Sequence, residues 1–226
     1  MKHEIKTYSS VLLLVVVLLV INNVSAQSIS QPIITWQANN FFPSDYQGKA
    51  LPSMGTRVSL SVMVIKSGKI LNLSGAKIFW YVDEKLINRE GEPTITFVAT
   101  KRGGDSHFVR VVIESKDGKF ENSTRIPMVK PSLVIGIPYA GNVVPRNSEL
   151  RLKALPFFFN ISSLNELGFS WQVGEERITN VSENELVVKI GAPLSELQKN
   201  LLLTASAENI GNPSEFGEEI VRLKIQ

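Results

Sequence analysis

A tryptophan-centred stretch of alternating apolar residues occurs twice in this sequence, and this repeat constrains the fold more than any other feature. Residues 78–84 (IFWYVDE) and residues 169–175 (FSWQVGE) are 91 positions apart and place Trp80 on Trp171. Other apolar positions match at nearly the same displacement: Val58 and Leu60 with Leu150 and Leu152, Ile95 and Phe97 with Leu186 and Val188, and Val109, Val111 and Ile113 with Leu201, Leu203 and Ala205. A unit of about 90 residues is too long for a solenoid repeat and has the size of a sandwich domain.

Apolar residues alternate over short stretches, and Gly, Pro, Asn and Asp interrupt them about every ten residues, which is typical of an all-β sandwich. We expect strands over residues 57–65, 77–82, 94–99, 108–114, 125–129, 149–154, 168–173, 185–190, 201–207 and 219–225. No helical period exceeds about three turns, and the best candidate for a helical turn is residues 194–202, after Pro193. The sequence therefore predicts an all-β fold of two tandem antiparallel β-sandwiches.

We place the first sandwich, with an N-terminal extension, at residues 27–130 and the second at residues 131–226. The join falls at Lys130-Pro131, between the last strand of one unit and the first strand of the next. Prolines near the join restrict the backbone, and almost no linker remains between the units. We therefore expect a stiff rod of two domains.

Residues 1–26 have the three parts of a secretory signal peptide: a weakly positive start, an apolar run at residues 11–21 and small residues at 24–26. The apolar run is short against the about 20 residues that a membrane span requires. This favours cleavage before Gln27 over an uncleaved anchor. No later segment supplies a longer run, so we expect a mature chain without a membrane span that is secreted, periplasmic or associated with the cell surface.

Composition narrows the source and the partners. The sequence contains no cysteine, whereas exported eukaryotic Ig-type domains commonly carry an inter-sheet disulfide, so a bacterial or archaeal source is favoured. The net charge of +3 arises from 24 basic and 21 acidic residues, an excess too small and too scattered for a nucleic-acid binder. Residues 27–130 hold 14 basic and 9 acidic residues, and residues 131–226 hold 8 and 11. We interpret this bias as solvated surface charge, with head-to-tail association as the alternative.

Both units contain a Trp strand followed by a polar turn, at residues 79–84 and 169–173, and further segments are 33–36 (IITW), 46–52 (YQGKALP) and 154–159 (ALPFFF). On these residues the sequence resembles the Ig-like and PKD-like sandwich modules of exported bacterial and archaeal surface proteins. The resemblance covers essentially the whole mature chain. Such modules are spacers or adhesive and interaction units, so the resemblance implies a non-catalytic role and supplies no catalytic residue.

Residues able to perform catalysis are scarce. His107 is the only histidine after the signal peptide, which excludes a multi-His zinc site. Ser106 points to the opposite face of a regular strand, so it cannot form a dyad with His107. The paired acids Asp83-Glu84, Glu175-Glu176 and Glu218-Glu219 lie at turns or strand starts, where we expect them to be solvated. No calcium-loop or phosphate-loop motif is present. We therefore expect no enzyme activity, no cofactor and no metal site. Weak calcium binding by loop carbonyls is the one alternative that the sequence leaves undecided.

After residue 26, four sequences match the N-glycosylation pattern, beginning at Asn72, Asn122, Asn160 and Asn180. The pattern is short and arises by chance in a chain rich in Asn and Ser. We interpret these asparagines as turn residues.

Trp80 and Trp171 are predicted core residues. Apolar residues lie two positions before and two positions after each of them. Under the period-two alternation of a strand, each Trp therefore lies on the buried face.

The opposite faces of the two Trp strands differ between the units. The second unit carries Ser170 and Gln172 there, which suit water, whereas the first carries large aromatic side chains. Aromatic residues and Arg are enriched at interface centres, so we predict an interaction patch formed by Phe79, Tyr81, Arg110 and Val112. The alternative is that residues 33–46, or an extra strand, cover this face.

The sequence as a whole predicts a non-catalytic exported module of the cell envelope or extracellular space that acts as an interaction unit or spacer. Its partner would be a protein or a glycan, and not a nucleic acid. The alternative function is carbohydrate binding, with sugars stacked on Phe79, Tyr81, Tyr46 and Phe41.

Overall fold

The computed structural model describes residues 31–87, 91–178, 183–191 and 199–226. The expected signal peptide, the glycosylation pattern at Asn180 and most of the expected helical turn at residues 194–202 lie outside these ranges. Leu201 and Leu202 are described, and they belong to a strand instead of a helical turn, because their alternation continues that of the following residues.

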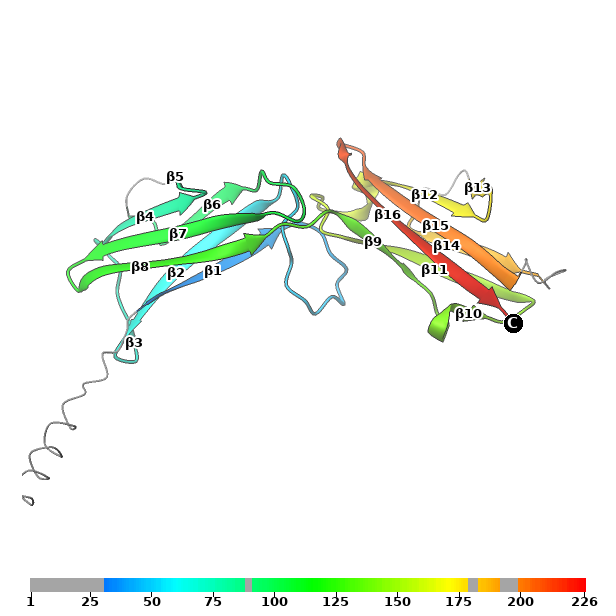
Figure 1. Cartoon of the computed structure of the whole chain (residues 1–226), viewed down its shortest axis with the longest axis horizontal. Coiled ribbons are helices and arrows are strands. Elements are labelled where there is room, and N and C mark those ends of the chain that lie inside the picture. Colours follow the sequence, from blue (N-terminus) through cyan, green and yellow to red (C-terminus); the bar gives the residue numbers. More distant parts are fainter. Residues whose placement is uncertain (1–30, 88–90, 179–182, 192–198) are drawn as a thin grey trace, which may run out of the picture.

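The first sandwich consists of two antiparallel sheets (Figure 1). One sheet contains β1 (Pro32–Asn39), β2 (Arg57–Lys66) and β6 (Thr94–Val98), with the short β3 (Lys69–Ile70) paired to the end of β2. The other sheet has the order β5 (Lys85–Leu86), β4 (Lys77–Val82), β7 (Ser106–Ser115) and β8 (Gly118–Pro127). The strand order matches that of an Ig-like sandwich, in which the chain crosses repeatedly between two antiparallel sheets.

The second sandwich repeats this arrangement, except that its described part lacks a counterpart of β3 and has one additional short strand, β10. One sheet has the order β14 (Glu185–Ile190), β11 (Ser148–Phe157) and β9 (Ser132–Gly136). The other has the order β10 (Val143–Val144), β16 (Asn212–Ile225), β15 (Asn200–Asn209), β12 (Leu167–Val173) and β13 (Glu176–Ile178). β10 pairs in parallel with the end of β16, and two short 3₁₀ turns lie at Ala140–Asn142 and Leu164–Glu166. The predicted all-β fold of two tandem Ig-like sandwiches is confirmed.

The strand register confirms most of the sequence repeat and corrects one part of it. Leu60 lies opposite Ile95, and their sequence matches Leu152 and Leu186 also lie opposite each other. Trp80 lies opposite Val111, but Trp171 lies opposite Ala205 instead of Leu203. β15 is therefore shifted by two residues relative to the sequence match. A shift of two conserves the buried face, so the apolar pattern alone could not reveal it.

All ten expected strands are present, and two of them begin seven residues earlier than expected. The strand expected at 125–129 begins at Gly118, because β7 and β8 form one long hairpin around a tight turn, and the strand expected at 219–225 begins at Asn212. β1 and β9 were not expected, although residues 33–36 of β1 were noted for their resemblance to surface modules. Each opens a sandwich and pairs with the second long strand of that sandwich.

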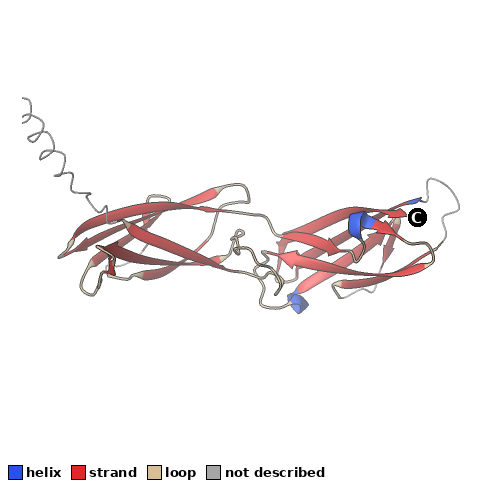
Figure 2. Cartoon of the chain, turned by 90° about the horizontal axis from the view of Figure 1, so that it is seen from below, coloured by secondary structure: helices blue, strands red, loops and turns tan. Residues whose placement is uncertain are grey.

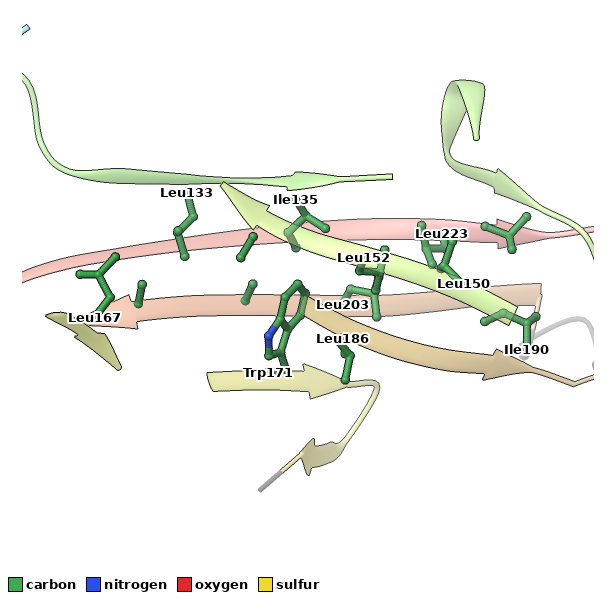
Figure 3. Close-up of a cluster of buried hydrophobic side chains, with 14 of the residues drawn as sticks. Leu133, Ile135, Leu150, Leu152, Leu167, Trp171, Leu186, Ile190, Leu203 and Leu223 are labelled. Atoms are coloured by element: carbon green, nitrogen blue, oxygen red, sulfur yellow. The ribbon is translucent and has the colours of Figure 1, made fainter. Parts of the chain in front are cut away.

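Each sandwich has its own hydrophobic core, and the two cores share no residue. The first runs from Val58 to Met128 and the second from Leu133 to Ile225, so the predicted join at Lys130-Pro131 lies between them. Trp80 is 0% exposed and Trp171 is 1% exposed, as expected for core residues. Figure 3 shows Trp171 pointing between the two sheets, toward Leu152, Leu186 and Leu203. The two sandwiches lie end to end in both views (Figures 1 and 2).

Candidate functional site: the interdomain joint and the outer sheet faces

The two sandwiches are connected by more than the peptide chain at the join. Phe41, just after β1, forms an isolated antiparallel bridge with Phe159, just after β11. Its N–H donates to the Phe159 carbonyl, and its carbonyl accepts from the Phe158 N–H, both at 2.7 Å. Phe158 has a φ of 64°, which is rare and costly for a bulky residue. The bridge holds this conformation, so the first sandwich determines a backbone geometry in the second.

Asn160 is the centre of the polar contacts across the joint. Its amide oxygen accepts from the Thr56 hydroxyl at 2.6 Å, and its amide nitrogen donates to the Met54 carbonyl at 2.9 Å. The same nitrogen lies 3.1 Å from the Ser53 hydroxyl, which donates to the Phe158 carbonyl at 2.8 Å. Ser53 and Thr56 are both buried. Because buried polar groups must keep their partners, this network favours one relative position of the sandwiches.

A buried carboxylate anchors Asn160 within the second sandwich. Glu215 accepts from the Asn160 backbone N–H at 2.7 Å and from its amide nitrogen at 2.8 Å. Its other oxygen accepts from the Asn209 amide at 2.6 Å. Glu215 has no ion-pair partner among the described residues, so hydrogen bonds alone compensate for its burial.

Residues 40–52 form a strap that contacts both sandwiches. Tyr46 makes edge-on ring contacts with Phe157 and Phe158 of the second sandwich, at centroid distances of 5.4 and 5.9 Å. Farther along the strap, the Lys49 ammonium lies 3.3 Å from the ring centroid of Trp36 in the first sandwich. Burial lowers the pKa of Lys49 from its ordinary value. The strap thereby adds aromatic packing to the polar network.

A second polar cluster lies at the end of the first sandwich that faces the joint. His107 is 2% exposed, and its Nδ1 lies 2.6 Å from an Asp83 carboxylate oxygen. The other oxygen of Asp83 accepts from the Lys101 ammonium at 2.7 Å and from the Phe108 N–H at 3.0 Å. Asp83 is exposed, as expected for a turn residue, but its carboxylate also binds Lys101 and the Phe108 N–H and lies against His107, which was not expected. The turn that contains it brings its carboxylate back over β7, which a local reading of the sequence does not show.

Burial raises the pKa of Asp83, but the hydrogen bonds from Lys101, the Phe108 N–H and His107 outweigh that effect and hold it below its ordinary value. The Nε2 atom of His107 accepts from the backbone N–H groups of Thr100 and Lys101, at 3.1 and 3.4 Å. An imidazole whose free nitrogen is occupied by two backbone donors has no atom left to take a proton from a substrate. The arrangement is suited to holding a loop, not to acid–base catalysis.

The predicted interaction patch lies on the outer face of the β5-β4-β7-β8 sheet. The register places Phe79 opposite Val112 and Tyr81 opposite Arg110, so the four residues are together. Arg110 stacks 4.1 Å from the Tyr81 ring centroid and also reaches the carboxylates of Glu84 and Glu121 at 3.3 and 3.4 Å.

The four residues are unequally available to a partner. Val112 is only 7% exposed, and the other three are half-buried. Leu86, which the sequence reading missed, lies opposite Tyr81 and is 48% exposed. The alternative that residues 33–46 cover this face was wrong, because β1 pairs along its whole length with β2 of the other sheet.

The second sandwich also exposes apolar side chains on its outer face, and these residues were missed. Ile220, Phe216 and Leu202 on β15 and β16 are all exposed, and Ile220 lies in the same cross-strand row as Gln172 and Thr204. Our comparison of the two units from sequence considered only the Trp strand and the strand beside it, and on the Trp strand of the second unit this face carries Ser and Gln. Phe216 and Ile220, four residues apart on the last strand, therefore went unnoticed.

The four aromatic residues of the carbohydrate-binding alternative do not lie together. Phe79 and Tyr81 lie on the outer face of the β5-β4-β7-β8 sheet of the first sandwich. Phe41 instead packs against the core of the second sandwich, and Tyr46 belongs to the strap. The stacked guanidinium of Arg110 also occupies one face of the Tyr81 ring. No single sugar-stacking platform is formed by these four side chains.

Three of the four glycosylation-like asparagines are described. Asn160 uses its amide in the joint, and the Asn122 amide donates to the Pro32 carbonyl at 2.5 Å. Asn72 is exposed and accepts from the Ser74 N–H, as a turn residue does. Among the described residues, no group of three His, Cys, Asp or Glu side chains could hold a metal ion. No helix in the same part of the chain has the length and apolar character needed to cross a membrane.

No protein-family model matches the chain, and a search of the curated proteins finds no match either. Solved structures of tandem domains do match. Three N-terminal domains of the bacteriophage RB49 highly immunogenic outer capsid protein match with 15% identity and a TM-score of 0.44, over 87% of this chain and 59% of that one. Fibronectin(III)-like modules of Clostridium thermocellum CbhA match with 16% identity and a TM-score of 0.29, over 86% and 94% of the two chains.

The mouse nectin-like molecule 4 ectodomain, with domains Ig1 to Ig3, matches with 14% identity and a TM-score of 0.35, over 86% of this chain and 64% of that one. The chain thus spans less than two thirds of the length of the phage and mouse structures.

Proposed function

We propose that the chain is a non-catalytic spacer and interaction module of the cell envelope or extracellular space, in which two Ig-like domains are held in one relative orientation. The observation that carries this proposal is the interdomain joint. A backbone bridge, a buried polar network centred on Asn160 and an aromatic strap all connect the domains. Domains tied only by a flexible linker would move independently, and a spacer of that kind would not fix the distance between its ends.

Export is part of the same proposal. It is supported by the leader-like composition of residues 1–26. Cell fractionation, followed by N-terminal sequencing of the exported protein, should find a chain that begins at Gln27. Recovery of the intact chain in the cytoplasm would contradict this part without affecting the joint.

The interaction part of the proposal assigns the outer face of the first sandwich to a protein partner or glycan of the envelope. Phe79 and Tyr81 are half-buried, and Leu86 adds exposed apolar area beside them. Apolar and aromatic residues with a neighbouring Arg are typical of the centre of a protein–protein interface, where they account for most of the binding energy.

The orientation can be measured directly, because a chain without cysteine accepts spin labels only at introduced sites. We suggest Thr96→Cys on β6 and Lys189→Cys on β14, both exposed, and a distance distribution measured by pulsed electron resonance. A fixed joint predicts a narrow distribution that Asn160→Ala broadens. The matched control is Asn72→Ala, which removes an exposed turn asparagine. A parent distribution as broad as that of Asn160→Ala would contradict the fixed joint.

A further inference from the structure

The loop that connects β6 to β7 is held by His107. The imidazole nitrogen Nε2 accepts the backbone N–H groups of Thr100 and Lys101, at 3.1 and 3.4 Å. A nitrogen that accepts hydrogen bonds carries no proton, so Nδ1 carries the ring proton and donates to Asp83 at 2.6 Å. The two observed hydrogen bonds to Nε2 therefore require a neutral His107.

The same loop supports the interdomain joint. The Ala99 carbonyl accepts from the Gly55 N–H at 2.7 Å, and the Ala99 N–H donates to the Thr56 carbonyl at 2.8 Å. Thr56 is the residue whose hydroxyl donates to Asn160 of the second sandwich. The contacts thus run without interruption from His107 through the loop and the Thr56 turn to Asn160.

A second part of the loop contacts the join itself. The Gly104 N–H donates to the Met128 carbonyl at 2.9 Å. A Cβ atom on Gly103 would lie 2.6 Å from the Lys130 backbone nitrogen and 2.8 Å from the Val129 carbonyl carbon. The loop is packed too closely against the join to move without disturbing it.

The charged groups around His107 are few. Asp83 and Lys101 contact the cluster directly, and the Lys101 ammonium also donates to the Ser106 carbonyl at 2.8 Å. The ring of Phe97 on β6 packs edge-on against the imidazole at 5.3 Å, and Ile126 is the opposite residue on β8. The remaining charged residues of the two flanking turns are Glu84, Arg102 and Asp105, all exposed.

We infer that proton uptake by His107 releases the loop at residues 99–104 and loosens the joint, so that the relative orientation of the two sandwiches depends on pH. A protonated imidazole is a donor at both nitrogens, and its Nε2–H would point at two further N–H donors in a buried site. The added charge would also lie close to the Lys101 ammonium. Asp83 stays ionised in the range where histidines titrate, because its pKa is lowered.

This inference rests on the proposed fixed joint and adds that the pH regulates it. If only the open loop accepts the proton, acid shifts the joint toward its open state, and the shift grows as the pH falls. The doubly spin-labelled full chain should therefore give a narrow distance distribution at pH 8 and a reversibly broadened one at pH 5. The control is His107→Gln, which keeps an acceptor near the position of Nε2 and cannot be protonated, and it should give the narrow distribution at both pH values.

The outcomes separate the two proposals. A broad distribution at pH 8 contradicts the fixed joint, whereas a narrow one at both pH values contradicts only the role of His107. Broadening at pH 5 in His107→Gln assigns the effect to a carboxylate such as Glu215 and overturns the inference. If His107→Gln fails to fold, NMR of the imidazole protons of the parent chain tests the inference instead. The signal of His107 must then change with pH at the same midpoint as the broadening of the distance distribution, and a different midpoint rejects the inference.

Discussion

The two sandwiches use the same strand order and the same buried Trp, but their outer faces distribute apolar side chains differently. In the first, one cross-strand row reads Tyr81, Arg110 and Ser123. In the second, the corresponding row reads Gln172, Thr204 and Ile220. The apolar side chain is therefore on the Trp strand in one copy and on the last strand in the other.

This difference shows that the core and the outer surface of a repeated domain follow separate constraints. Inward positions must fill a closed space, so both copies place a Trp, surrounded by aliphatic residues, at the same point. Outward positions meet only solvent or a partner, so the backbone permits either arrangement. The outer faces are consequently where the two copies can differ in function.

The largest expected effect concerns the buried Trp that the two sandwiches share. Trp80→Ala and Trp171→Ala should each destabilise their own sandwich by about 3 to 5 kcal/mol, because each removes a fully buried aromatic side chain. Trp80 also donates to the Glu92 carbonyl at 3.0 Å, whereas Trp171 Nε1 has no partner among the described residues. Denaturant unfolding followed by circular dichroism, which reports on both sandwiches, should therefore show the larger loss for Trp80→Ala. Equal losses would mean that this hydrogen bond contributes little.

The next effect concerns the cluster of Asp83, Lys101 and His107 in the first sandwich, which has no counterpart at the same place in the second. Val109 lies opposite Val82 and Leu203 lies opposite Val173, so Leu201 is the structural counterpart of His107. Replacing Asp83 by Asn, which tolerates the positive φ of 49° but cannot accept from both Lys101 and His107, should cost about 1 to 3 kcal/mol. Glu84→Gln, in the same turn and exposed, is the control and should change little.

The same substitution should alter the response of stability to acid. The folded pKa of Asp83 lies below its unfolded value of about 3.9. Its contribution is therefore present above pH 4 and disappears as the pH falls through the folded pKa. Urea unfolding between pH 2 and pH 7 should show that Asp83→Asn lowers stability at pH 7 and removes part of this acid sensitivity. An unchanged pH profile would show that the Lys101 and His107 contacts do not stabilise the fold.

Much of the fold, but little of the joint, was predictable from the sequence. The burial of Trp80 and Trp171 and the positions of the long strands could be derived because alternation at period two is a local signal. Thr56 and Asn160 are 104 residues apart and are ordinary turn residues by type, so no local pattern connects them. The same holds for Asp83 and His107, 24 residues apart, which meet only because the Asp83 turn folds back over β7. The aromatic pairs Phe41-Phe42 and Phe157-Phe158 were the one available sign of the strap.

A smaller effect tests the difference between the outer faces. Phe79→Ser with Tyr81→Gln gives the first sandwich the residues of the second, and because both side chains are half-buried we expect a loss of about 1 to 2 kcal/mol. The variant should fold and should lose binding to any envelope partner of this face. Ser170→Ala with Gln172→Ala, on the corresponding face of the second sandwich, is the control. A collapse of stability would mean that Phe79 and Tyr81 belong to the core and not to an interface.

The smallest effect is expected at Ile220, where the second sandwich has its own exposed apolar side chain. Ile220 is 55% exposed, so Ile220→Ser should change stability by no more than about 0.5 kcal/mol. The reciprocal change, Ser123→Ile, places the same side chain at the corresponding exposed position of the first sandwich and should be equally mild. Thermal unfolding of both variants measures this. A loss several times larger for Ile220→Ser alone would show that the last strand of the second sandwich is covered by another part of the chain or by a second molecule, and the two outer faces would then differ in burial as well as in sequence.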